Sequence, residues 1–169
     1  MLLKRGEATT QPTKALAGRR AEPVLYAAAA LSLAAALIHL WVMPEHFEEW
    51  WGYGAFFLVA AAAQALYVPL LLRWPGRTLL LLGIRVNLAI ALLYLLTRTV
   101  GIPLFGPHAG EVEGVGFADL CATTSELGII VALGAALLRG LSAERRRLVL
   151  IVAAVALVSV GHVVHLLLR

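Results

Sequence analysis

The sequence predicts an all-α membrane protein, a bundle of five transmembrane helices with a cytoplasmic N-terminus and an extracytoplasmic C-terminus. Hydrophobic residues make up 61% of the 169 residues, whereas soluble domains are about 45–50% apolar, and the mean hydropathy is +0.86. A soluble domain of this length has too little interior to bury so much apolar surface. Five apolar runs, each close to the roughly 20 residues that a bilayer-crossing helix needs, alternate with short polar segments. Residues 23–169 are therefore predicted to fold as one membrane domain.

The predicted elements follow in order along the chain. Residues 1–22 are polar and basic without apolar periodicity, and we expect a flexible cytoplasmic tail there. Each apolar run is expected to be helical, because in lipid only a helix pairs its own backbone groups. A proline followed by glutamates suits a helix start, which predicts a short interfacial helix over 44–53. Glycines and prolines predict irregular backbone in the outer loop 98–116. The predicted spans are 24–43, 54–72, 78–97, 117–138 and 148–168.

The basic residues predict the orientation. Short cytoplasmic loops are enriched in lysine and arginine, and eleven of the fourteen basic residues fall in the tail and in the 2–3 and 4–5 connections. Those segments are therefore placed in the cytoplasm. The net charge of +4 does not indicate nucleic-acid binding, because the basic residues lie at the ends of apolar segments. The carboxylates on the opposite side are Glu45, Glu48, Glu49, Glu111, Glu113 and Asp119.

Ionisable residues inside the apolar runs predict a buried site that opens outward. An ionised carboxylate near the bilayer centre costs about 2.5–3.5 kcal/mol, so Glu126 needs a partner, either a histidine of the fifth span or Arg98. Imidazole and carboxylate ligands suit zinc, iron, copper or manganese, and two histidines could ligate a haem iron. The alternative is hydrogen bonding between helices without any ligand. The expected ligands are His39, His162, His165 and Glu126.

Two further groups of polar residues are candidates for binding. Asn87, Tyr94 and Arg98 share one stripe of the third span and are expected to contact a cofactor. Glu45 and Glu49 share a helix face at i and i+4. With the neighbouring polar residues they predict an outer vestibule that collects cations, the alternative being a solvated face of the interfacial helix. The vestibule residues are Glu45, His46, Glu49 and Asp119.

These patterns favour redox or metal handling by a bound transition metal or haem. We find no His-Glu-x-x-His, Gly-x-Ser-x-Gly or phosphate-loop signature, so catalysis is not indicated. Cys121 is the only cysteine, which excludes an intrachain disulfide. One alternative is an accessory subunit that docks a larger membrane complex, or a second copy, through its polar helix faces. Another is a small ion or solute transporter, for which five spans without internal repeats are an awkward architecture.

Two segments carry a resemblance to known proteins. They are Pro-Glu-His-Phe-Glu-Glu-Trp-Trp-Gly-Tyr-Gly at 44–54 and Thr-Arg-Thr-Val-Gly-Ile-Pro at 97–103. Both are similar to segments of small polytopic membrane proteins of bacteria that have no assigned activity. The resemblance covers the first four spans. It implies a bacterial plasma membrane and this order of helices, but no activity.

Overall fold

The computed structural model describes residues 23–102, 106–139, 141, 143–144 and 147–151. The regular structure of this part of the chain is entirely helical, with α1 over Pro23–Glu49, α2 over Trp51–Arg73, α3 over Arg77–Thr99 and α4 over Phe117–Arg139. Each of the four is long and apolar enough to cross a membrane. The protein is thus a multi-pass membrane protein, and these helices occupy the first four predicted spans. Residues 148–151 of the fifth predicted span are helical, and its remainder lies outside the described residues.

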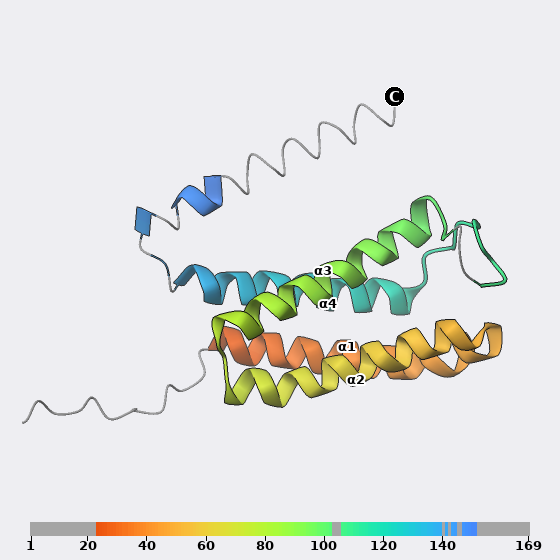
Figure 1. The fold of residues 1–169 in the computed structure, drawn as a ribbon, viewed down its shortest axis with the longest axis horizontal. Helices are drawn as coiled ribbons and strands as arrows, with labels where there is room; N and C mark the ends of the chain where they lie inside the picture. Colours follow the sequence, from red (N-terminus) through yellow and green to blue (C-terminus); the bar gives the residue numbers. More distant parts are fainter. Residues whose placement is uncertain (1–22, 103–105, 140, 142, 145–146, 152–169) are drawn as a thin grey trace, which may run out of the picture.

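The four helices alternate in direction, so their termini gather at two ends of the bundle (Figure 1). The α1–α2 turn and the α3–α4 loop meet at one end, and the α2–α3 turn lies at the other. We call the first the acidic end, because it carries Glu45, Glu48, Glu49, Glu111, Glu113 and Asp119. We call the second the basic end, because it carries Arg73, Arg77 and Arg139.

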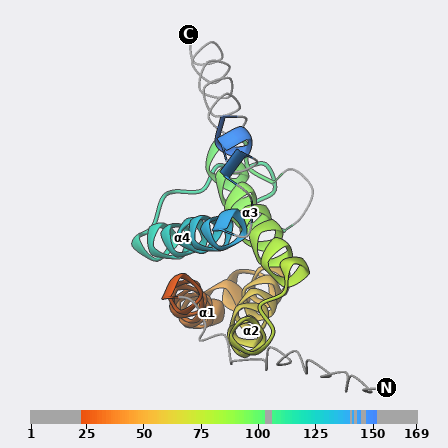
Figure 2. The same cartoon turned by 90° about the vertical axis from the view of Figure 1, so that its left-hand side faces the viewer.

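The helices do not pack equally against one another. The principal packing is of α1 against α2 and α4, and of α4 against α3, whereas α2 and α3 have few contacts. Figures 1 and 2 show that α3 is inclined to the other three helices. The bundle is therefore closed on three sides and partly open between α2 and α3.

The structure corrects the expectation of a separate interfacial helix over 44–53. α1 continues through Pro44 to Glu49, and α2 begins at Trp51 after a single extended residue, Trp50. A proline removes only one helical hydrogen bond, which helices in membranes tolerate. The backbone N–H of Trp50 donates to the His46 carbonyl oxygen at 3.1 Å and keeps the turn tight. The polar residues expected on the interfacial helix therefore form the last turn of α1.

Small side chains let the helices approach closely, as is common in membranes. Ala28 and Ala35 of α1 have no exposed surface. A Cβ on Gly83 would lie 2.2 Å from the Tyr67 hydroxyl oxygen, so glycine is needed where α3 meets α2. The apolar core lies toward the basic end and consists of Leu25, Ala28, Ala29, Tyr67, Leu71, Leu80, Ile129, Ala132 and Leu133.

Candidate functional site

A histidine–glutamate pair lies inside the bundle. His39 of α1 and Glu126 of α4 are 3% and 1% exposed, and their Nε2 and Oε1 atoms are 3.2 Å apart. His39 is ten residues from the acidic end of α1 and Glu126 is nine from that of α4, so both lie about 14–15 Å deep at 1.5 Å per residue. The Nδ1 atom of His39 is buried and has no hydrogen-bond partner among the described residues. Within the described part of the chain, one imidazole nitrogen therefore has a hydrogen-bond partner and the other does not.

A second polar group links three helices further from the acidic end. Ser32 of α1 donates from its hydroxyl to the Gln64 side-chain oxygen at 2.5 Å and lies 2.9 Å from the Gln64 carbonyl oxygen. The Gln64 amide donates to Asn87 Oδ1 at 2.8 Å, and the Asn87 amide donates to the Gly83 carbonyl oxygen at 2.8 Å. These hydrogen bonds join polar side chains that lipid cannot solvate. They hold α1, α2 and α3 in register.

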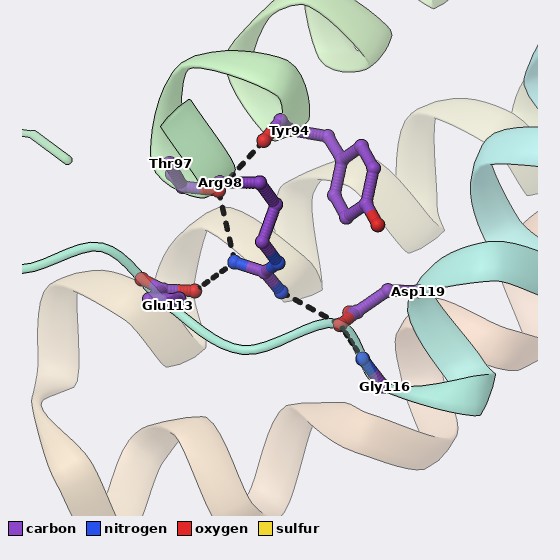
Figure 3. Close-up of polar contacts among 6 residues, drawn as sticks. All are labelled: Tyr94, Thr97, Arg98, Glu113, Gly116 and Asp119. Carbon is purple, nitrogen blue, oxygen red and sulfur yellow. Dashed lines mark hydrogen bonds and ion pairs between the residues drawn. The ribbon is translucent and has the colours of Figure 1, made fainter. Parts of the chain in front are cut away.

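The third polar group fastens the α3–α4 loop at the acidic end (Figure 3). The Arg98 guanidinium donates to Asp119 Oδ2 at 2.6 Å and to the Glu113 carboxylate. It also donates to the Thr97 hydroxyl at 2.9 Å and lies 4.9 Å above the Tyr94 ring. Charge-assisted hydrogen bonds of this kind are stronger than neutral ones. Arg98 thereby ties α3 to the loop and to the first turn of α4.

A cavity of about 550 Å³ opens at the acidic end. Its walls come mainly from the C-terminal part of α1, the α3–α4 loop and the first turn of α4, together with Tyr53 of α2 and Arg98 of α3. The titratable side chains around it are mostly acidic, and this excess of carboxylates favours cations over anions. The titratable lining residues are Glu45, His46, Glu49, Tyr53, Arg98, His108, Glu111, Glu113 and Asp119.

His46 connects this cavity to the buried pair. Its Nδ1–H donates to the Val42 carbonyl oxygen at 2.9 Å, so its Nε2 is the nitrogen left for another partner. Its ring centroid lies 4.0 Å from that of Phe57, and the His39 ring lies 5.7 Å from the same phenylalanine. Phe57 is therefore a ring neighbour of both the cavity histidine and the buried one.

The structure brings some of the candidate residues together and separates others. All four vestibule candidates line the one cavity at the acidic end. Within the candidate metal set, His39 and Glu126 are paired, whereas His162 and His165 lie outside the described residues. In the third-span stripe, Tyr94 contacts Arg98, but Asn87 is bonded to Gln64 and Gly83 instead. The proposed stripe is thus split between two sites.

Some partners differ from those expected from sequence. The partner of Glu126 is His39, whereas Arg98 bonds to Asp119 and Glu113. Glu113 was not singled out among the outer carboxylates, because nothing in its spacing distinguishes it within the glycine-rich loop. The link between Gln64 and Asn87 was also missed, since each is a lone amide in its span. The useful signal was that an isolated amide in an apolar span needs a polar partner.

The two ends of the bundle therefore have different chemistry. Carboxylates, histidines and one arginine occupy the acidic half, and an apolar core fills the half toward the basic end.

Among the described residues, no three histidine, cysteine, aspartate or glutamate side chains are grouped so that they could hold a metal ion. No protein-family model, curated protein or solved structure matches the chain.

Proposed function

We propose that the protein binds a transition-metal ion at His39 and Glu126 and serves metal handling or redox chemistry from the outer side of the membrane. The observation that carries the proposal is the 3.2 Å distance between His39 Nε2 and Glu126 Oε1. Two ligands of a tetrahedral zinc ion, each about 2.0–2.2 Å from the metal, lie about 3.3–3.6 Å apart, close to the distance in the pair. The pair thus has the spacing of two ligands of one ion, and burial keeps water from competing for it.

The packing around the pair favours an ion over a haem. A Cβ on Gly128 of α4 would lie 2.8 Å from Cδ1 of Leu31 on α1, so these two helices are already in close contact. Neither the cavity at the acidic end nor a second hollow, a groove of about 340 Å³ between α2 and α3, is lined by His39 or Glu126. A haem beside His39 would have to force the two helices apart. A metal ion would only replace the hydrogen bond between His39 and Glu126.

The other ligands are proposed to come from the predicted fifth span. His162 and His165 belong to that predicted span and lie outside the described residues. Their spacing of i and i+3 would place them on one face of a helix. A metal-binding histidine usually donates its second N–H to a carboxylate, carbonyl or water. His39 Nδ1 has no such partner in the described part of the chain. Within the described part of the chain the buried pair therefore lacks a further partner, and the histidines of the predicted fifth span are the remaining members of the expected ligand set.

The distribution of polarity supports binding from one side only. The cavity lies at the acidic end, on one side of the buried pair. On the other side the apolar core, which includes Leu25 and Leu133, closes the bundle toward the basic end. A polar route across the whole bundle would need ionisable groups in that core as well. We therefore favour an outward-opening binding site over a pathway for transport.

The orientation is tested by labelling single cysteines in a Cys121→Ala background. We expect Glu48→Cys to react with a membrane-impermeant maleimide from outside, and Ala143→Cys to react only after the membrane is opened. The reason is that the arginines gather at the basic end. A tag at the C-terminus should also be reached from outside, because five spans place the two termini on opposite sides. The reverse labelling pattern would move the acidic cavity to the cytoplasm.

The metal proposal is tested by elemental analysis of protein purified in detergent without chelators. We expect about one metal ion per chain, and at least a tenfold loss of affinity in Glu126→Gln and His39→Asn, since even outer partners of ligands are worth about 10–100-fold. The matched control is Glu48→Gln, which removes an exposed carboxylate that does not line the cavity. The proposal would be refuted if the unmutated protein contained no metal. It would also be refuted if Glu126→Gln and Glu48→Gln contained equal amounts of metal.

A further inference from the structure

A groove runs along the open side of the bundle between α2 and α3. Its volume is about 340 Å³, and its walls are almost entirely apolar. α2 supplies residues from Phe56 to Leu70 and α3 supplies residues from Leu79 to Ile90. The groove belongs to neither the cavity at the acidic end nor the His39–Glu126 pair.

Two buried amides line this apolar groove. Gln64 and Asn87 are 3% and 2% exposed, and both are lining residues. A side-chain amide nitrogen carries two N–H groups. Gln64 uses one to bond Asn87, and Asn87 uses one to bond Gly83. The second N–H of each amide has no acceptor among the described residues, so two hydrogen-bond donors remain to be satisfied.

The depth of the amides restricts what can satisfy them. Asn87 is ten residues from one end of α3 and twelve from the other, so it lies about 15–18 Å from either end. With a hydrocarbon core about 30 Å thick, that position is near the bilayer centre. Phospholipid headgroups and interfacial water lie too far away. An acceptor carried by a molecule that dissolves in the hydrocarbon itself can reach this depth.

We infer that the groove between α2 and α3 binds a membrane-soluble carbonyl compound of the quinone type. Its apolar walls take the ring and the first part of an alkyl chain, and the free N–H groups of Gln64 and Asn87 donate to the carbonyl oxygens. A volume of about 340 Å³ lies at the small end of the roughly 300–1,000 Å³ of ligand pockets. It suits a single substituted ring. This inference is independent of the metal site.

The role of the amides is tested with two probes of similar shape. A decyl-substituted 1,4-benzoquinone carries the carbonyl groups and decylbenzene does not. Binding of each to the full chain in lipid nanodiscs is measured by equilibrium titration. We expect saturable binding of the quinone and at least tenfold weaker binding of decylbenzene. The inference would be overturned if the quinone showed no saturable binding, or if the two probes bound with equal affinity. Both outcomes are measured on the unmutated chain, so neither depends on how a variant folds.

The location of the site is tested with two adjacent alanines of α2. Ala63 and Ala62 are both exposed, but only Ala63 lines the groove. Ala63→Trp should fill the groove and weaken quinone binding at least tenfold, whereas Ala62→Trp should bind as the natural sequence does. Size-exclusion profiles of the two variants establish that both fold. Equal affinities in the two variants would place the bound quinone elsewhere and overturn the inference.

Discussion

Replacing His39 by leucine is expected to lower the free energy of unfolding by about 3 kcal/mol, because it leaves the Glu126 carboxylate buried without a partner. Replacing Glu126 by leucine as well should restore most of the loss. A buried ion pair exchanged for apolar residues of similar volume is often neutral in stability. The single variant should thus be less stable than the double variant, although the double variant has lost more native groups.

The measurement is a double-mutant cycle on the natural sequence, His39→Leu, Glu126→Leu and the double variant, unfolded in detergent with a chelator present. The chelator removes any contribution of bound metal. His46→Leu is the matched control, because among the described residues that histidine hydrogen-bonds only to a backbone carbonyl of its own helix. This change should alter stability by less than about 1 kcal/mol. Additive effects of the two single changes would show that His39 and Glu126 are not coupled.

Placing alanine at Gly101 is expected to be more damaging than the same change at Gly110 or Gly114 of the α3–α4 loop. Gly101 ends α3 with a φ of 76°, and its N–H donates to the Leu96 carbonyl oxygen at 3.0 Å. A Cβ there would lie 2.5 Å from the Glu111 backbone oxygen. The left-handed conformation costs alanine about 1–2 kcal/mol, and overpacking adds about 1–3 kcal/mol. We expect a loss of about 3 kcal/mol or more.

Two other glycines of the loop separate these causes. Gly110 has a φ of 84° but open space around its Cβ position, so Gly110→Ala should show the conformational cost alone. Gly114 has open space and no positive φ, so Gly114→Ala should leave stability nearly unchanged. Proteolysis of the folded protein in detergent should show the same order, with the Gly101→Ala loop cut fastest. An equal effect at Gly101 and Gly110 would mean that the loop relaxes away from Glu111.

The fold could be predicted from sequence in the apolar segments, where the lipid environment requires a helical backbone. α1 to α4 lie within a few residues of the predicted spans, because an apolar run in a bilayer must satisfy its backbone as a helix. Pro44 was the exception. A proline followed by glutamates suits a helix start, and the same residues are tolerated within a membrane helix. The sequence pattern alone does not distinguish these two outcomes.

The site could be predicted only in part, because helical phase gives the face of a residue but not the neighbour that the face meets. His39 and Glu126 are both expected ligands of one buried site, and the structure pairs them. Which side chain each polar group meets depends on which helices are adjacent, and the separation of α2 from α3 has no signal in the sequence. Metal or haem binding, the fifth span, a larger complex and a homo-oligomer stay predictions.

The order of the paired residues along the chain has a consequence for how the protein is made. α1 and α2 are joined through Trp50 alone, and α2 and α3 through residues 74–76, so these three helices leave the ribosome in quick succession. His39 and Arg98 are then already synthesised when α4 emerges with Asp119 and Glu126. Because chains are synthesised from the N-terminus, each carboxylate of α4 enters a bilayer in which its cationic or imidazole partner is present. The partners of the two α4 carboxylates are thus already in the membrane when α4, the last of the four described helices, inserts.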